Sequence, residues 1–274
     1  MEAKMFNKIF SALIKEAQFT REMLGSGATQ IRSANYATKG VYFQAFTSLS
    51  TGLERIGKLC LMLDYYIDHS NKFPDSDYMR NTIGHSIELI YTGSMEIVKK
   101  RSILLKFTPK PLSPIHQAIL KNLSEFARGD RYSNINLVTG DKRQGDPIAS
   151  WFTEVDLPLY TTCVSEKKKK NIHNNAIAVS ELLSPNAMVR HVSETGTGIT
   201  VLEDASIRTG VYTAVAPYRQ LYVLQIIRYW IELLTSLQNT SMQGNDDIPD
   251  FGEIFAPFYN SDTYFKTRKT WETL

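Results

Sequence analysis

An arginine, an asparagine and a histidine lie close together in the stretch SDYMRNTIGHSIELIY, residues 76–91. Arg80 is followed directly by Asn81, and His85 comes five positions after the arginine. A neutral imidazole can take the proton from a ribose 2′-hydroxyl, and a guanidinium can hold a phosphate and stabilise the charge developing on its oxygens. Asn81 can orient the histidine or bind a phosphate oxygen. These residues indicate metal-independent cleavage of single-stranded RNA, whose flexible backbone can reach the in-line geometry.

The spacing of Arg80 and His85 does not place them on one face of an ideal helix. Five residues correspond to about 140° of rotation and about 7.5 Å of rise. The side chains can converge if Arg80 lies in the first helical turn, or if a twofold-related subunit supplies the complementary half of the cleft. The alternative is that Arg80 is a surface residue near a helix start and that His85 is hydrogen-bonded within the helical bundle.

Two further pairs of residues are candidates for RNA binding. Arg131 and Tyr132 follow a predicted helix and can bind a phosphate or stack on a base; the alternative is that they anchor a loop. Lys167 and Lys168 belong to a run of four lysines. That run is interpreted either as a patch that steers phosphates or as a solvated loop.

A long amphipathic helix is predicted over residues 41–69. Apolar residues recur there at spacings of three and four and form one continuous stripe: Tyr42, Phe46, Leu49, Leu53, Ile56, Cys60, Leu63 and Ile67. Glu54 and Arg55 fall outside the stripe. They are interpreted as an outward ion pair or a bond to the neighbouring helix, with Glu54 in the wall of the cleft as the alternative.

The second predicted helix begins after Pro74 and carries the motif near its start. One residue among Asp75, Ser76 and Asp77 can cap it, and the cations at residues 99–101 suit its C-terminal end. We expect this helix to pack antiparallel to the long one. Its predicted apolar face contains Ile83, Ile87, Ile90, Ser94 and Ile97.

Two more helices complete the predicted bundle. One begins at Ser113-Pro114, a capping residue followed by a proline at the first helical position, and stops at Gly129. The other begins near Pro217 and is apolar nearly all round, as is typical of a central buried helix. Polar residues interrupt its already short apolar run, so we expect no membrane span.

The remaining segments lack this periodicity. Residues 128–147 contain several turn formers and are predicted to form a loop. Residues 141–214 are interpreted as an insertion within a single domain spanning residues 1–274, with a hairpin around Thr195-Gly196-Thr197-Gly198. The aromatic tail, residues 245–274, either wraps the bundle or docks on a second subunit. The sequence thus predicts a mainly α fold: an antiparallel bundle of four to five core helices with a small irregular or β-hairpin insertion.

Bulk composition narrows the class of protein. The 274 residues, 43% of them hydrophobic, can bury a core, and a net charge of +3 gives no global field that favours nucleic acid or membrane. Cys60 and Cys163 have neither zinc-ligand spacing nor a disulfide pattern. The N-terminus has no uninterrupted apolar core and no small-residue cleavage site. We therefore expect a cytoplasmic protein without a metal, a cofactor or a membrane anchor.

The arrangement Arg80-Asn81-x-x-x-His85 at a helix start, after a long helix containing GLERIGKL, resembles the HEPN superfamily (higher eukaryotes and prokaryotes nucleotide-binding). The segments FPDSDYMRNTIGHSIELI and LSEFARGDRYSNIN resemble a group of bacterial proteins placed near it, and the likeness covers roughly residues 36–140 and the last helix. The resemblance implies a four- or five-helix bundle, homodimerisation across the motif and metal-independent ribonuclease activity in toxin–antitoxin or antiviral systems. Gly84, immediately before His85, departs from a regular helix.

Three hypotheses follow from these observations. The first is a homodimeric endoribonuclease in which His85 is the general base and Arg80 holds the phosphate. It would have an antitoxin or another defence-system protein as its partner. The second is a non-catalytic helical module that binds a partner protein or a nucleotide. The third is a structural dimer with residues 251–271 as its main interface.

Overall fold

The apolar stripe of the long predicted helix lies at the centre of the molecule. The computed structural model describes residues 7–107, 112–242 and 248–272, which are mainly helical and include one small antiparallel sheet. Helix α2 (Gly40–Asp68) buries the whole stripe except Ile67, which is partly buried against the same core. The mainly α fold class with a small hairpin is confirmed.

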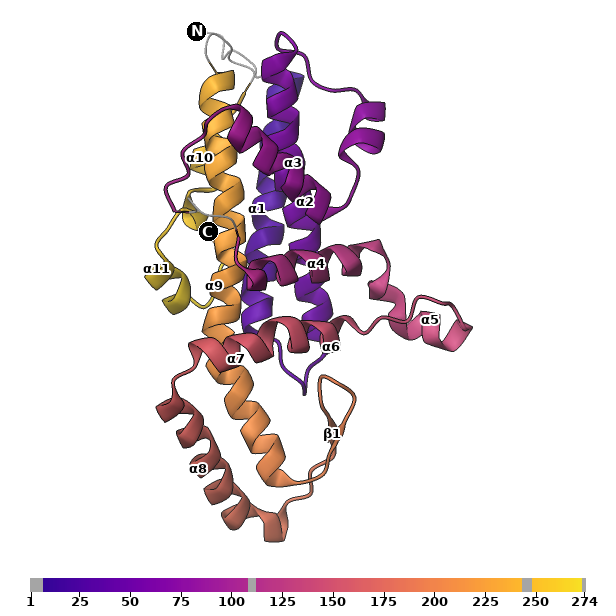
Figure 1. Cartoon of the computed structure of the whole chain (residues 1–274), viewed down its shortest axis with the longest axis vertical. Coiled ribbons are helices and arrows are strands. Elements are labelled where there is room, and N and C mark those ends of the chain that lie inside the picture. Colours follow the sequence, from indigo (N-terminus) through magenta and orange to yellow (C-terminus); the bar gives the residue numbers. More distant parts are fainter. Residues whose placement is uncertain (1–6, 108–111, 243–247, 273–274) are drawn as a thin grey trace.

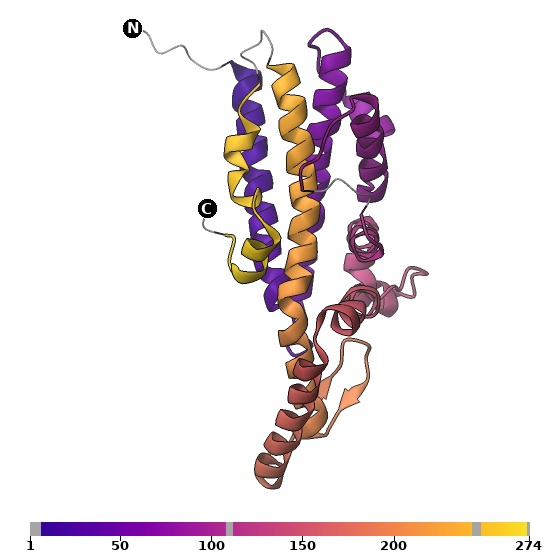
Figure 2. The same cartoon turned by 60° about the vertical axis from the view of Figure 1, so that its left-hand side comes forward.

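Three long helices lie side by side along the molecule (Figures 1 and 2). Helix α1 (Lys8–Ser33) runs antiparallel to α2, because Arg55 of α2 reaches back to Glu16 while Leu49 touches Gly27. Helix α9 (Leu202–Ser241) runs parallel to α2. Arg219 lies over the Tyr42 ring near the start of α2, and further along both helices the Cys60 thiol donates to the carbonyl oxygen of Trp230. α9 is buried nearly all round beyond Val215, as expected for a central helix.

Helix α3 (Ile87–Lys100) runs parallel to α2, so the predicted antiparallel pairing of these two helices is wrong. His85, just before α3, contacts Glu54, whereas Lys100 at the end of α3 forms ion pairs with Asp64 and Asp68. Residues later in α3 therefore contact residues later in α2, as in a parallel pair. The cause is the connection over residues 69–86, which returns along α2 before α3 begins.

The predicted motif helix is broken between Arg80 and His85. Residues Tyr78–Ile83 form one π-helical turn, and Gly84 then has a φ of 67°, in the left-handed region that favours glycine. Ser86 is extended and precedes the first residue of α3. His85 therefore lies in a short non-helical link.

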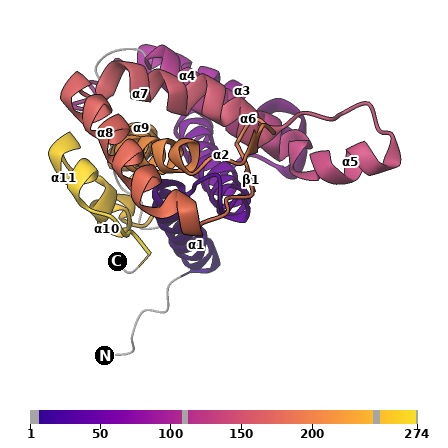
Figure 3. The ribbon, with the colours of Figure 1, turned by 90° about the horizontal axis from the view of Figure 1, so that it is seen from below.

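Helix α4 (Pro114–Arg128) has the predicted limits, with Ser113 as its cap and Gly129 at its end. The predicted loop that follows is partly helical: a 3₁₀ turn (Asp130–Tyr132) leads into α5 (Ser133–Thr139). Figures 1 and 3 show α5 projecting away from the bundle.

Most of the predicted insertion is helical. It contains α6 (Pro147–Trp151), a π-helical turn (Phe152–Asp156), α7 (Leu157–Cys163), α8 (Glu166–Leu183) and a 3₁₀ turn (Ser184–Asn186). Strands β1 (His191–Val192) and β2 (Gly198–Ile199) then pair antiparallel, which confirms the predicted hairpin. α9 begins at Leu202 rather than near Pro217, so residue 214, the predicted end of the insertion, lies inside a continuous helix.

The described part of the tail packs on its own bundle. It forms α10 (Phe251–Ile254), a 3₁₀ turn (Ala256–Phe258) and α11 (Asp262–Thr267), which contact α9. Its phenylalanine rings and its tryptophan are fully buried within the chain: Phe251, Phe255, Phe258, Phe265 and Trp271. The expectation that the tail wraps its own bundle is confirmed for the described residues.

Candidate functional site

His85 lies on the surface, beside α2. Its side chain is 72% exposed, so the imidazole is not enclosed by the bundle. The left-handed backbone of Gly84 and the extended Ser86 hold this residue outside both helical segments. A solvent-facing imidazole can reach a bound substrate, which a core histidine cannot.

A carboxylate on α2 holds the imidazole. Glu54 Oε1 lies 2.9 Å from His85 Nδ1 and 2.7 Å from Lys58 Nζ, and Lys58 Nζ lies 3.3 Å from the same Nδ1. Because a carboxylate only accepts and the Glu54 contact is the shorter of the two, we assign the proton to Nδ1, donating to Glu54. Nε2 forms no hydrogen bond with a described residue and has its lone pair free. The arrangement is that of a base oriented by an acidic group.

The sequence predicted His85 as the base and gave Glu54 in the wall of the cleft as an alternative. Glu54 does not pair with Arg55, which instead binds Glu16 of α1 at 2.7 Å. Glu54 and Lys58 are four residues apart on α2, an order and spacing that favour an ion pair on a helix. That spacing was the available signal for Lys58, but the proximity of both to His85 depends on the direction of α3.

Arg80 and Asn81 lie on the π-helical turn and are exposed. Within the described residues, neither side chain forms a hydrogen bond or an ion pair, and neither is joined to His85. The structure therefore brings the three motif residues to one edge of the molecule without bonding them to one another. Both side chains remain available to a ligand.

Arg131 and Tyr132 are linked to this edge through α4. The hydroxyl of Ser86 lies 3.3 Å from that of Ser124, and Arg128 binds Glu88 at 3.2 Å, so the end of α4 sits against the start of α3. The 3₁₀ turn with Arg131 and Tyr132 follows directly, and the Arg131 guanidinium stacks over the Tyr132 ring at 5.1 Å. Both residues are exposed.

Lys167 and Lys168 lie elsewhere. They are exposed in the first turn of α8, capped by Ser165, so the predicted loop is wrong at this position. Figure 1 shows α8 at the lower end of the molecule, beside the first part of α9, and α3 in its upper half. The structure does not bring these lysines together with His85.

An apolar groove of about 410 Å³ adjoins the Glu54–Lys58–His85 cluster. Lys58 belongs to both, and the rest of the wall comes from α1, α2 and the connection before α3, including Leu59, Phe73 and Met79. Met79, which lines the groove, directly precedes Arg80 in the chain. A flat apolar group such as a base can be placed there next to a positive charge.

A second cluster lies in the lower half and was missed by sequence reasoning. Fully buried Arg219 donates to both oxygens of Asp156 at 2.9 and 2.7 Å and to the carbonyl oxygens of Ile31 and Ala34. Tyr42 and Trp151 also donate to Asp156. Burial raises the pKa of the Tyr42 hydroxyl. The available signal in the sequence was Arg219, a charged residue within the apolar helix α9, which indicates a buried partner of opposite charge.

The described residues contain no group of three or more histidine, cysteine or acidic side chains arranged to hold a metal ion. None of their helices combines the length and the apolar content that crossing a membrane requires. Comparison of the chain with protein-family models, curated proteins and solved structures finds no match.

Proposed function

We propose that this chain is a metal-independent endoribonuclease in which His85 is the general base and Arg80 holds the scissile phosphate. The observation that carries the proposal is the exposed imidazole of His85, fixed through Nδ1 by Glu54 with Nε2 free toward solvent. An acid–base residue needs this combination of a fixed ring and an accessible lone pair. The resemblance of the Arg80-Asn81-x-x-x-His85 motif to the HEPN superfamily points to the same chemistry.

The proposed reaction is an intramolecular transesterification. Nε2 takes the proton of the ribose 2′-hydroxyl, and the resulting oxygen attacks the adjacent phosphorus. The bond from phosphorus to the 5′-oxygen breaks, which leaves a 2′,3′-cyclic phosphate and a 5′-hydroxyl that receives a proton from an imidazolium or from water. Arg80 supplies positive charge for the phosphate oxygens, and Asn81 supplies a further donor.

A homodimer is part of the proposal. Leu89 lies on α3, four residues after His85, and is 68% exposed, which offers an apolar contact for a twofold partner. Two copies of Arg80 and His85 would then flank one cleft. Arg131 and Tyr132 would hold the RNA strand beyond the scissile bond, whereas Lys167 and Lys168 would reach only a long RNA.

The cellular setting is proposed from the resemblance alone. It is a cytoplasmic toxin–antitoxin or antiviral defence system in which a partner protein restrains the nuclease. An apolar groove beside the cluster, lined by Phe73 and Met79, offers that partner or an RNA base a place to bind.

The test is cleavage of single-stranded RNA in a chelating buffer by the wild type and by His85→Ala and Arg80→Ala. We expect each of these variants to lose about 10²- to 10⁴-fold in rate, the usual contribution of a positioned acid–base or oxyanion group. His173→Ala and Arg190→Ala are matched controls, because both residues are exposed and neither forms a hydrogen bond with a described residue. Equal cleavage by all five proteins, or none by the wild type, rejects the nuclease.

A second candidate function is a non-catalytic module that binds a partner protein through α5. This short helix projects from the bundle and exposes Ile135, Leu137 and Val138, the last of them 87% exposed. An apolar patch on a projection is typical of an interaction site. Val138→Asp should then abolish co-purification of a partner while His85→Ala leaves it intact. The opposite pattern would reject this candidate.

A further inference from the structure

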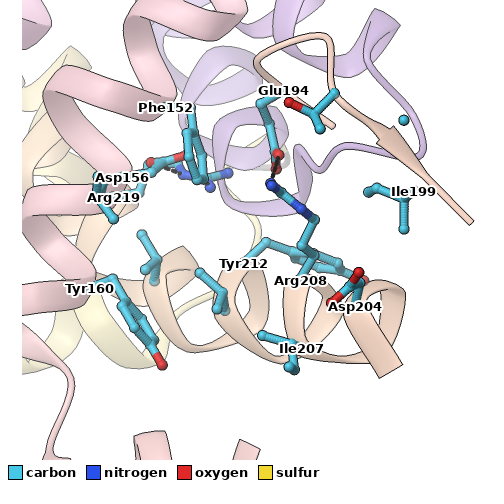
Figure 4. Close-up of a pocket in the computed structure, with 15 residues that line it drawn as sticks. Phe152, Asp156, Tyr160, Glu194, Ile199, Asp204, Ile207, Arg208, Tyr212 and Arg219 are labelled. Carbon is cyan, nitrogen blue, oxygen red and sulfur yellow. Dashed lines mark hydrogen bonds and ion pairs between the residues drawn. The ribbon is translucent and has the colours of Figure 1, made fainter. Parts of the chain in front are cut away.

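A cavity of about 380 Å³ lies between α7, the hairpin and the first part of α9. Figure 4 shows side chains from these elements facing a common open space, with Asp156 and Arg219 on one side and Glu194 and Arg208 on the other. The volume is in the range of small-molecule sites, which are mostly apolar with a few placed polar groups. This cavity is remote from His85 and takes no part in the proposed ribonuclease chemistry.

Both guanidinium groups of the wall are already paired. Arg219 is held by Asp156 and by two main-chain carbonyls, so its charge is compensated inside the protein. Arg208 donates to Glu194 Oε2 at 2.8 Å. An anionic ligand would have to displace one of these carboxylates, and the cavity is therefore a poor site for phosphates or carboxylates.

The carboxylates of the wall are not all paired. The side chain of Glu194 is only 3% exposed, and its second oxygen, Oε1, accepts no hydrogen bond from a described residue. Asp204, in the first turn of α9, has no partner among them either. Three carboxylates and two guanidinium groups line the cavity, and the carboxylate without a guanidinium partner is that of Asp204, an exposed residue at the start of α9. Glu194 Oε1 can therefore accept a hydrogen bond from a ligand or from water in the cavity.

The rest of the wall suits the body of an organic cation. Phe152, Tyr160 and Tyr212 present aromatic surface, and Ile207, Val211 and Ile199 present aliphatic surface. Arg208 lies 5.8 Å from the centre of the Phe152 ring and Lys169 lies 5.5 Å from that of Tyr160, whereas the Tyr212 ring carries no such cation among the described residues. Aromatic faces attract ammonium groups, and the effect grows when the cation is desolvated. We propose that this cavity binds a small organic cation: an aromatic or aliphatic molecule whose protonated amine donates to Glu194 Oε1.

The hairpin fixes the position of Glu194. Lys39 Nζ donates to the carbonyl oxygen of Ser193 at 2.6 Å, and the Ser193 hydroxyl accepts from the main-chain N–H of Thr197 at 2.9 Å. The first bond ties the hairpin to the residue that precedes α2, and the second closes the turn of the hairpin. Together they position the Glu194 carboxylate before a ligand binds. A preformed acceptor lowers the ordering cost of binding.

The proposal is tested with tryptamine, 3-methylindole and indole-3-acetate, which share one ring system and carry a cationic, a neutral and an anionic side chain. Calorimetric titration of the full chain should give saturable binding of tryptamine and at least about tenfold weaker binding of the other two. Glu194→Gln should weaken tryptamine at least about tenfold, whereas Glu181→Gln, an exposed acidic residue on α8, should not.

A second variant keeps the proposal falsifiable if Glu194→Gln does not fold. Ile207→Trp fills the cavity without removing a charged group and should abolish binding of tryptamine. The proposal is overturned if no saturable binding occurs at millimolar tryptamine, if the neutral or anionic analogue binds equally well, or if binding survives Ile207→Trp or a folded Glu194→Gln.

Discussion

The molecule carries an arginine in two contrasting settings. In the lower half, Arg219 and Asp156 are buried and their polar atoms are paired with each other, with Tyr42, with Trp151 or with main-chain carbonyls. At the upper edge, Arg80 is exposed and has no hydrogen-bonded partner among the described residues, and the imidazole held by Glu54 faces solvent. A buried pair whose hydrogen bonds are all made can contribute to stability and specificity, whereas surface groups with unused hydrogen-bonding capacity are available for chemistry.

The largest effect on stability is expected from breaking the buried pair. Arg219→Met leaves the Asp156 carboxylate uncompensated in the core and should lower the free energy of unfolding by about 3–5 kcal/mol. Urea unfolding followed by circular dichroism measures it. Arg80→Met should change the same quantity by less than about 0.5 kcal/mol. A loss below about 1 kcal/mol for Arg219→Met would show that the lower network does not hold the fold together.

A smaller loss is expected beneath the upper site, where α2 and α3 approach closely. A Cβ on Gly57 would lie 2.4 Å from Ile90 Cγ2 and 3.2 Å from the Trp230 ring, so Gly57→Ala should cost about 1–3 kcal/mol through overpacking. The matched control is Gly93→Ala on α3, whose Cβ would meet only Leu61 Cδ2 at 3.3 Å and should be nearly neutral. Equal midpoints of thermal unfolding for both variants would contradict the close approach of Gly57 to Ile90 and Trp230.

A still smaller, pH-dependent effect is expected at His116 of α4, which is partly buried and bonded to Ser113 and Gln225. Burial lowers its pKa below the ordinary value. The unfolded chain then binds more protons than the folded one, so stability is complete above the ordinary histidine pKa and falls as pH drops toward the folded value. Denaturant midpoints of the wild type should therefore decrease between about pH 7 and about pH 5 more steeply than those of His116→Gln. Identical slopes would count against this sign.

The smallest effect on stability is expected at Glu54, together with a clear effect on activity. Glu54→Gln removes a partly exposed charge and should change the free energy of unfolding by less than about 0.5 kcal/mol. If His85 is the base, RNA cleavage should nonetheless fall about 10- to 100-fold, with a changed pH–rate profile, because the ring loses the group that fixes its tautomer. Unchanged cleavage by a folded Glu54→Gln protein would show that Glu54 does not position His85.

Sequence periodicity predicted the helices that bury a continuous stripe. The limits of α2 and α4 follow from apolar spacing, from Ser113-Pro114 and from Gly129, all of them local signals. The direction of α3 could not be predicted in this way, because it depends on how residues 69–86 return along α2. The start of α9 was placed too late because Pro217 was taken as a boundary, although the helix accommodates it internally.

The candidate site was predictable only in part. Arg80, Asn81 and His85 were found from residue type and spacing, but the contact of His85 with Glu54 and Lys58 is a tertiary one. The cavity beside Glu194 combines residues from the π-helical turn Phe152–Asp156, from the hairpin and from α9, which are far apart along the chain. Such a combination has no periodic signature, so it could be found only in the folded molecule.

The central position of α9 has a consequence for synthesis. Helices α1 to α8 leave the ribosome before α9 does, yet the apolar face of α2 packs against α9 in the finished protein. Until that last long helix is translated, the nascent chain exposes a large apolar surface that can associate with other chains. We expect fragments that stop before residue 202 to aggregate or to be retained by chaperones.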